Sequence, residues 1–507
     1  MTQDRTGSGG ALADLLHGAW SRMGERVSIR DGGADWSGRR LLERAGVIRR
    51  GLCDLGIAPN EPVLVFVSNT AADFAALLGV WEAGGVVVPV HRNSPAGAVA
   101  GLQEDTGSRF QVDGDLTAWP GVAGQQPCDE RPGVRRLNPV FSASDPILEG
   151  AALVVFTSGS TGRPKGVVLS HAAMARKLEN NQSVFGFDGR DRTLLVLQIT
   201  FSFGLWVSLL ALTREAVLVV KQRVLLADVL DTAAAEAITR TGMVPTTLRA
   251  LVAETGRPGP VAAALGRVVG CGRLRHIFTG GESYPAPLAD AVRRLLPGAF
   301  VTNIFGLSET CTCDFMLGPA DAQRHPGCVG RAAPDVSYRL VDDGGQVIED
   351  AGIGELQIAT PTIMNGYLHQ PELTGSSFSD GFFRTGDLVR RHADGVLEVV
   401  GRLKEVISRG GNKVYPQEVE QALLSHPAVA HALVTGVPDE LMGERIHAAV
   451  VMIAGQQADP GALRDWAARR LDRFKLPDVI HPVAELPVGR TGKSDRGRLR
   501  ERLMSGA

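Results

Sequence analysis

The chain has 507 residues, of which 44% are hydrophobic and 21% are charged, so it can bury a large core and is expected to form two to four domains. Its net charge of −2 at pH 7 provides no overall attraction to nucleic acid or to an anionic membrane surface. The first ten residues are polar, and the six cysteines lack the spacing of a metal site. We therefore expect no signal peptide and a cytoplasmic protein with reduced thiols.

Helices and strands alternate in the N-terminal part of the chain. Apolar residues at helical spacing over 41–55 predict a helix that ends before Gly56. Apolar, β-branched runs at 62–67 and 85–90 predict two strands, with a helix over 71–82 between them. This alternation indicates an α/β fold with a mainly parallel sheet.

A loop of small residues follows the strand predicted over 153–156. It carries four hydroxyl groups and two glycines: Thr157, Ser158, Gly159, Ser160, Thr161 and Gly162. Such a loop can surround phosphate oxygens with N–H and O–H donors, and Lys165 adds a cation behind it. Pro164 stands where the Walker motif requires its second glycine, so this is a different phosphate loop. A plain Ser/Gly turn is the alternative interpretation.

The run from Thr157 to Lys165, Thr-Ser-Gly-Ser-Thr-Gly-Arg-Pro-Lys, resembles the phosphate-binding signature of the adenylate-forming enzymes. That superfamily includes acyl- and aryl-CoA synthetases, peptide-synthetase adenylation domains and beetle luciferases. The resemblance extends over most of the chain and implies that ATP activates a carboxylic acid to an acyl-adenylate. It also implies a large N-terminal domain (1–402) of mainly parallel, layered sheets flanked by helices. A small, mobile α+β domain (403–507) would follow.

Residues 193–213 carry no charge and are long enough to cross a bilayer. Because polar residues interrupt this segment, we expect no membrane span but a buried strand over 194–197, a loop and a core helix. By resemblance, the stretch 198–205 lines the acyl pocket. Phe201 replaces a histidine that is frequent in CoA ligases, and Ser202 stands where amino-acid-activating relatives often carry an aspartate.

The identity of residue 202 bears on the substrate. A serine pairs only weakly with an ammonium group, so an α-amino acid is not expected. The stretches 198–206 and 311–317 are mostly apolar. They predict a hydrophobic or aromatic body on the carboxylic acid.

Two further stretches are expected to contact the nucleotide. The resemblance assigns to them Gly280, Gly281, Glu282, Phe305, Gly306, Ser308 and Glu309. The glycines would let the backbone approach the adenine, on which Phe305 would pack. Ser308 would contact the α-phosphate. Glu309 would hold Mg²⁺, a hard cation that takes one or two carboxylates together with phosphate oxygens.

The last signatures begin near the domain boundary. Asp387 and Arg402 would bind the ribose, since the two oxygens of a carboxylate suit a vicinal diol. Lys404 matches the hinge of the family. The resemblance also assigns roles in catalysis and thiol transfer to Gly410, Gly411 and Lys493. The two glycines would line the channel for coenzyme A, and Lys493 would be the catalytic lysine that stabilises the charge of the reacting oxygens.

Lysine is rare in this chain, with seven lysines against 46 arginines. Four of the seven lie in the stretches described above: Lys165, Lys404, Lys413 and Lys493. Where arginine is so strongly preferred, a lysine suggests a site that requires a compact point charge.

The resemblance predicts a ligase that adenylates a small-molecule acid and transfers the acyl group to coenzyme A, with ATP and Mg²⁺ as the other cofactors. A stand-alone enzyme that loads an acyl carrier protein would share these motifs. A luciferase-like oxygenase also shares them, and a non-catalytic nucleotide binder on the same fold is an alternative of another class. No nucleic-acid partner is expected. The sequence is compatible with a homodimer but does not determine the oligomeric state.

Overall fold

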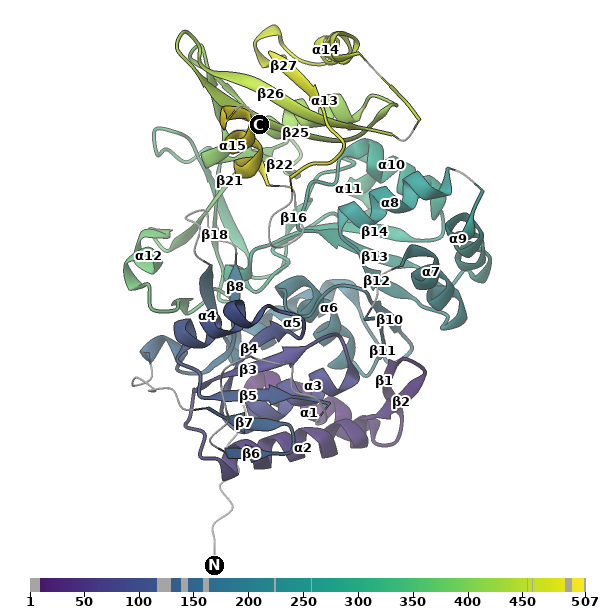
Figure 1. Cartoon of the computed structure of the whole chain (residues 1–507), viewed down its shortest axis with the longest axis vertical. Helices are drawn as coiled ribbons and strands as arrows, with labels where there is room; N and C mark the ends of the chain where they lie inside the picture. The colour runs from purple at the N-terminus through teal and green to yellow at the C-terminus, as the bar shows by residue number, and fades with distance from the viewer. Residues whose placement is uncertain are drawn as a thin grey trace, which may run out of the picture.

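The computed structural model describes residues 10–115, 129–137, 145–157, 164–222, 225–256, 258–453, 455–457, 459–487 and 495–505. Two large sheets, with helices between them and on their outer faces, make up the lower part of the molecule in Figure 1. A third sheet rises from them toward a small C-terminal unit at the top of the view. The predicted α/β class, a large layered unit followed by a smaller one, is confirmed.

Sheet A has nine strands in the order β16-β15-β14-β13-β12-β10-β11-β1-β2. Its central pairings, from β14 through β13, β12, β10 and β11 to β1, are all parallel. Its strands are β1 (Val27–Asp31), β2 (Ala34–Ser37), β10 (Arg192–Leu195), β11 (Val217–Val220), β12 (Arg240–Gly242), β13 (His276–Gly280), β14 (Phe300–Phe305), β15 (Phe315–Met316) and β16 (Arg331–Ala332).

Sheet B has eight strands in the order β19-β9-β8-β4-β3-β5-β7-β6. Its centre is parallel, and every residue of β3 is buried, as expected for a strand covered on both faces. Its strands are β3 (Pro62–Val67), β4 (Val86–His91), β5 (Phe110–Asp113), β6 (Asp129–Arg131), β7 (Val134–Arg136), β8 (Ala151–Thr157), β9 (Lys165–Ser170) and β19 (Gly366–Tyr367).

Helices fill the space between the two sheets and cover their outer faces. The inner helices share one core cluster with both sheets: α1 (Ala11–Met23), α2 (Gly38–Asp54), α3 (Ala71–Glu82), α5 (His171–Phe185) and α6 (Ser202–Leu212). The other face of sheet A packs on α7 (Leu226–Ala235), α8 (Pro245–Thr255), α9 (Pro260–Cys271) and α10 (Ala286–Leu295). The other face of sheet B packs on α4 (Ala96–Thr106).

The uncharged segment noted in the sequence contributes to β10 and forms the inner helix α6. The helix was predicted, and the strand, Arg192–Leu195, begins and ends two residues before the predicted 194–197. All residues of α6 from Gly204 to Leu212 are buried, so the helix is apolar because it lies in the protein core. Within the residues that the structure describes, no helix is both long and apolar enough to cross a membrane.

Sheet C was not anticipated from the sequence. It is antiparallel throughout and lies between sheets A and B and the C-terminal unit (Figure 1). Its strands are β17 (Ser337–Val341), β18 (Gly352–Ala359), β20 (Phe378–Ser379), β21 (Phe382–Arg391) and β22 (Leu397–Arg402). The short helix α11 (Pro319–Arg324) lies between β15 and β16 of sheet A in the sequence, and α12 (Pro371–Ser376) precedes β20.

The C-terminal unit is built on sheet D, with its own apolar core. Its elements are β23 (Ile407–Arg409), β24 (Asn412–Val414), α13 (Pro416–Leu424), β25 (Val429–Asp439), β26 (Gly443–Met452), α14 (Pro460–Ala468), β27 (Val479–Pro482) and α15 (Arg496–Ser505). We propose that the two domains divide between residues 402 and 403. This point falls after the last strand of sheet C and before the first strand of sheet D.

Candidate active site

The predicted phosphate loop closes a β-hairpin. Strands β8 and β9 are antiparallel, and Thr157 lies opposite Lys165 at the base of the loop. Strand β9 was not predicted from the sequence. The remaining loop residues assigned to phosphate binding lie outside the described residues: Ser158, Gly159, Ser160, Thr161 and Gly162. Their role in phosphate binding stays a prediction. The residues at the two ends of the loop, Thr157 and Lys165, are paired in the hairpin.

Lys165 and Glu309 meet at a tyrosine that the sequence did not single out. The ammonium of Lys165 lies 5.1 Å from the centre of the Tyr367 ring, within range of a cation–π interaction. The Tyr367 hydroxyl donates a hydrogen bond of 2.8 Å to Glu309 Oε1. Burial, reinforced by the charge of Glu309, raises the pKa of Tyr367, so the phenol stays protonated and remains a donor.

The residues assigned to adenine lie at the carboxyl ends of β13 and β14, which are parallel neighbours. Ligands commonly bind at this edge of an α/β sheet. A Cβ atom on Gly280 would lie 2.4 Å from the carbonyl oxygen of Ile304, so only glycine fits there. Gly281 has φ of 80°, and Glu282 Oε2 accepts hydrogen bonds from Thr246 (2.6 Å) and Arg249 (3.0 Å).

Phe305 ends β14 and packs on Phe315, with 6.0 Å between the ring centres. The chain then turns sharply through the short helix η2 (Ser308–Thr310). A Cβ atom on Gly306 would lie 2.2 Å from the backbone nitrogen of Cys313, so the two ends of this turn are in direct backbone contact.

Three consecutive non-glycine residues in this turn have left-handed backbone conformations. The φ angles are 61° at Cys311, 69° at Thr312 and 58° at Cys313. Each such residue costs on the order of 1–3 kcal/mol and persists only where its surroundings impose it. Here the backbone hydrogen bonds Thr312 N to Leu307 O (2.9 Å) and Asp314 N to Phe305 O (2.7 Å) hold the turn closed.

Asp387 and Arg402 lie opposite each other on β21 and β22. Arg402 Nε is 2.8 Å from Asp387 Oδ1, and the aspartate side chain is 3% exposed. Among the described residues, Asp387 Oδ2 has no hydrogen-bond partner although it is buried. Burial raises the pKa of Asp387 to about 6, against the opposing effect of Arg402. A buried carboxylate oxygen without a partner can accept a hydrogen bond from a hydroxyl group of a ligand.

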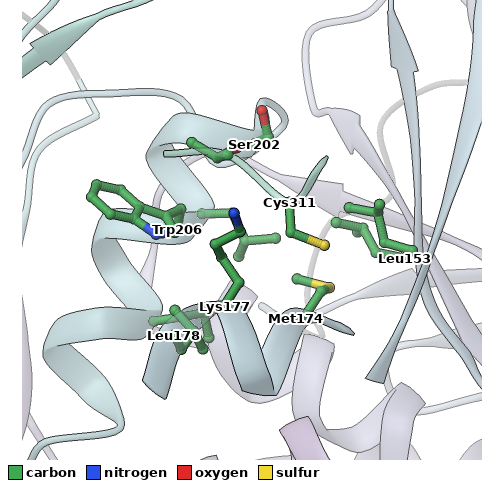
Figure 2. Close-up of a pocket in the computed structure, with 11 residues that line it drawn as sticks. Leu153, Met174, Lys177, Leu178, Ser202, Trp206 and Cys311 are labelled. Atoms are coloured by element: carbon green, nitrogen blue, oxygen red, sulfur yellow. The ribbon is translucent and has the colours of Figure 1, made fainter. Parts of the chain in front are cut away.

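A mainly apolar cavity adjoins the turn from Gly306 to Asp314 (Figure 2). Its lining consists of Leu153, Leu169, Met174, Lys177, Leu178, Ser202, Leu205, Trp206, Leu209, Cys311 and Thr312. The two stretches predicted to form the acyl pocket therefore both contribute to it. Ser202 Oγ lies 3.3 Å from Ser308 Oγ, which connects the cavity to the turn that carries Glu309.

A buried ion pair borders this cavity. Lys177 reaches from α5 between Trp206 and Cys311 in Figure 2, and its Nζ lies 2.7 Å from Asp314 Oδ1. The side chains are 2% and 0% exposed, and Asp314 Oδ2 also accepts a hydrogen bond from the Thr310 hydroxyl. Sequence reasoning missed this pair. One signal was available in the sequence: lysine is rare in this chain, and Lys177 stands among apolar residues of a helix.

Lys404 lies in η3 (Leu403–Glu405), directly after the strand that carries Arg402. Partial burial and the Arg402 guanidinium lower its pKa, and the charges of Lys165 and Asp387 also act on it. Lys404 is therefore close to the cluster described above, as a hinge residue beside the nucleotide site would be.

Gly410 and Gly411 form the tight turn between β23 and β24, with φ of 55° and 80°. Lys413 of the same hairpin forms an ion pair with Asp343 of the large unit. The contacts found for this hairpin among the described residues do not include Glu309, Asp387 or Arg402, so the structure does not bring the two glycines into the nucleotide site.

Lys493 lies outside the described residues, and its catalytic role stays a prediction. The chain on both sides of it is well held. Asp495 N donates to Pro487 O at 2.8 Å. Arg496, whose side chain is 15% exposed, forms ion pairs with Glu405 (3.1 Å) and Glu420, so the start of α15 is anchored beside Lys404.

Comparison with known sequences and structures gives a consistent result. The AMP-binding enzyme family matches residues 16–368, and the C-terminal domain of AMP-binding enzymes matches residues 418–493. An indoleacetate–CoA ligase from Aromatoleum aromaticum is 35% identical over 69% of this chain and 66% of its own length. A feruloyl-CoA synthase from an Amycolatopsis species is 28% identical, with 96% of this chain and 99% of that protein covered.

Other relatives extend the comparison. Surfactin synthase subunit 1 from Bacillus subtilis is 29% identical over 91% of this chain, which spans only 13% of that protein. The o-succinylbenzoate–CoA synthetase from Bacillus subtilis, solved with its acyl-adenylate intermediate, has a TM-score of 0.80 at 25% identity, with 97% of both chains covered. The amide bond synthetase McbA from Marinactinospora thermotolerans has a TM-score of 0.82 at 25% identity, with 97% of this chain and 99% of that chain covered. The chain therefore belongs to the family of AMP-binding enzymes, within the adenylate-forming superfamily, and has acyl- and aryl-CoA ligases among its relatives.

Proposed function

We propose that this protein is an AMP-forming acid–thiol ligase. A carboxylic acid attacks the α-phosphorus of ATP, pyrophosphate leaves, and a thiol, coenzyme A, then takes the acyl group and releases AMP. The 3.3 Å contact between Ser202 and Ser308 carries this proposal, because it joins the apolar cavity to the turn that holds Glu309. An acid in the cavity and a nucleotide above the turn would thus meet at one place.

The nucleotide would be held by residues from three sheets. The open oxygen of Asp387 suits the ribose hydroxyls, and Arg402 would fix the orientation of that carboxylate. The two glycines at the end of β13 and the ring of Phe305 would border the adenine. Thr157 and Lys165, at the base of the phosphate loop, would direct the leaving phosphates away from the acid.

Glu309 is the residue that would hold Mg²⁺. Its Oε1 accepts a hydrogen bond from Tyr367, and a carboxylate is the kind of ligand that this cation takes beside phosphate oxygens. A bound Mg²⁺ would neutralise part of the negative charge on the phosphates. The contribution of the protein is to position the two reactants, since phosphoryl chemistry needs little covalent participation from side chains.

The lining of the cavity supports a hydrophobic or aromatic acid. Leucine, methionine and tryptophan side chains make up most of this lining, which suits an uncharged, apolar body. The nearby carboxylate of Asp314 is already bound to Lys177 and Thr310. No free carboxylate therefore remains, among the described lining residues, to hold the ammonium of an α-amino acid.

Lys493 would stabilise the charge that develops as the carboxylate approaches the α-phosphate. The small domain would then rotate about Lys404 and bring the Gly410–Gly411 turn to the site for the thiol step. The ion pair between Arg496 and Glu405, the neighbour of the hinge residue Lys404, supports a link between the hinge and the segment that carries Lys493.

Coenzyme A is the favoured acceptor because several relatives are named as CoA ligases. A carrier-protein thiol is the second candidate, since the chain also aligns with part of a peptide synthetase subunit. The structural similarity to an amide bond synthetase makes an amine a third acceptor to be tested. All three share the adenylation step.

The test measures pyrophosphate release from Mg-ATP across a panel of aryl, short-chain, long-chain and amino acids. We expect release with aryl or hydrophobic acids and an acyl-CoA product when coenzyme A is added. Release without acyl-CoA formation would move the acceptor to a carrier protein or an amine. ATP binding without release for any acid would favour a non-catalytic binder and contradict the proposal.

The variant Lys493→Ala should lower the adenylation rate by about 10²–10³-fold, the usual effect of removing a group that stabilises transition-state charge. Lys475→Ala is the matched control, because Lys475 lies in the same domain but pairs with Glu418 (2.8 Å) and Asp472 (3.0 Å). Equal rates for the two variants would contradict the assigned role.

A further inference from the structure

A second cluster of reactive side chains lies outside the site described above. His325 and Cys328 follow α11, and His392 begins the turn between β21 and β22. One nitrogen of each imidazole and the sulfur of Cys328 all lie within 4.8 Å of one another. From these residues we propose a metal site that binds Zn²⁺, independent of the adenylation function.

The distances fit a tetrahedral ion. Zinc binds sulfur at about 2.3 Å and histidine nitrogen at about 2.1 Å, so a tetrahedral site separates the two ligand atoms by about 3.6 Å. Cys328 Sγ lies 3.7 Å from His392 Nε2. The ring centres of His325 and His392 are 4.8 Å apart, and the third ligand atom, a nitrogen of His325, lies within 4.8 Å of the other two.

The donor set selects the class of metal. One thiolate and two imidazoles are typical ligands of zinc and of neighbouring transition metals, whereas Mg²⁺ and Ca²⁺ prefer oxygen. On binding, Zn²⁺ would replace the proton of the Cys328 thiol, which passes to the solvent. This cluster therefore differs in chemistry from the carboxylate that we assign to Mg²⁺.

Two carboxylates border the cluster. Asp394 Oδ2 lies 2.9 Å from His325 Nε2, and Glu398 Oε2 lies 3.3 Å from His392 Nε2. Each carboxylate also pairs with an arginine, Asp394 with Arg324 at 3.1 Å and Glu398 with Arg390 at 2.7 Å. Asp394 can orient the His325 imidazole, as carboxylates commonly do for metal-binding histidines, whereas Glu398 approaches the same nitrogen of His392 that faces Cys328. Glu398, or a water molecule, would complete the fourth position of the ion.

The backbone around the cluster is held in place. Val329 N donates to Leu397 O at 2.9 Å, so the segment that follows Cys328 pairs with the start of β22. His392 N donates to Val396 O at 2.9 Å across the turn. His325 and Cys328 lie in one of two paired segments, and His392 lies in the other. A bound ion would therefore cross-link the two segments.

The site is separate from the nucleotide. His392 directly follows β21 and is five positions from Asp387, or about 17 Å at the usual rise of a strand. A metal here would therefore stabilise the hairpin that carries Asp387 and Arg402 without touching a substrate. We infer a structural role.

The experiment uses the full-length protein without an affinity tag, freed of metals by a chelator and dialysed. Titration against a competing zinc indicator should give one tightly bound Zn²⁺ per chain, and zinc should raise the temperature of unfolding. Substitution by Co²⁺ should give a thiolate-to-cobalt absorption band in the near ultraviolet.

Cys328→Ser should abolish the cobalt band and lower zinc affinity at least tenfold, while the adenylation rate stays within twofold of the wild type. Cys271→Ser, an exposed cysteine, and Cys313→Ser, a buried one, are the matched controls and should keep the band. His392→Asn retains the thiol and should also lower the affinity, which covers the case in which Cys328→Ser does not fold.

Three results would overturn the proposal. The first is no zinc binding by the wild type at micromolar concentration. The second is a cobalt band that survives in Cys328→Ser, which would assign the binding to another thiol. The third is zinc affinity that is the same in the wild type and in both substituted variants.

Discussion

Replacing Lys177 by methionine should destabilise the protein strongly, although the two side chains are similar in size. The substitution leaves the Asp314 carboxylate buried, at 0% exposure, without its cation. Breaking a buried ion pair in this way costs about 3–5 kcal/mol. Against a total stability of roughly 5–15 kcal/mol, this loss should appear as a large shift of the unfolding transition.

The matched control is Lys221→Met. Lys221 Nζ also lies 2.7 Å from a carboxylate, that of Asp228, but the side chains are 24% and 51% exposed. Exposed pairs contribute about 0–1 kcal/mol, so the control should lose little. The comparison keeps the substitution and the distance constant and changes only the burial.

The assay is urea unfolding followed by tryptophan fluorescence, to which Trp206, in the lining of the same cavity as Lys177, contributes as one of six tryptophans. The double variant Lys177→Met/Asp314→Asn removes both charges and should recover at least half of the loss, because no buried charge is left unpaired. A double variant no more stable than the single one, or equal losses in Lys177→Met and Lys221→Met, would refute the reasoning.

Three further changes test the site. Burial raises the pKa of Asp387 to about 6, and its carboxylate form is the better acceptor of hydrogen bonds from the ribose hydroxyls. The KM for ATP should therefore rise as the pH falls below about 6. Asp387→Asn should raise this KM and make it less dependent on pH. Ser202→Asp should reduce kcat/KM for uncharged acids at least tenfold, measured by pyrophosphate release, because it adds an unpaired charge to the cavity; unchanged values would separate the cavity from the acid. Gly306→Ala should lower both stability and kcat, since its Cβ would lie 2.2 Å from Cys313 N, and an active, stable variant would contradict that packing.

Helices and strands could be predicted from the sequence where their burial leaves a pattern of apolar residues along the chain. The strand at Pro62–Val67 and the helix at Ala71–Glu82 have the predicted bounds, because continuous burial leaves a clear apolar run in each. The helix within the uncharged segment was also expected. Its lack of charge follows from its position between two sheets.

Other features depend on contacts between distant residues and leave no local pattern. Strand β9 begins at Lys165, a residue that the motif assigns to the phosphate loop, and its antiparallel pairing with β8 leaves no local pattern. Tyr367 and Glu309 are 58 positions apart, and Lys177 and Asp314 are 137 apart. Sequence motifs identified Glu309 and Lys165, whereas only the folded chain shows the tyrosine that links them.

The turn from Gly306 to Asp314 explains how one short segment can serve both substrates. A right-handed continuation after η2 would direct the following residues away from the cavity, whereas three left-handed residues reverse the chain and place Cys311 and Thr312 in its lining. Glu309 meanwhile stays bonded to Tyr367 on the nucleotide side. The buried pair of Lys177 and Asp314 anchors the end of this reversal. The cost of the strained backbone is thus offset by the same contacts that bring the acid pocket beside the metal-binding carboxylate.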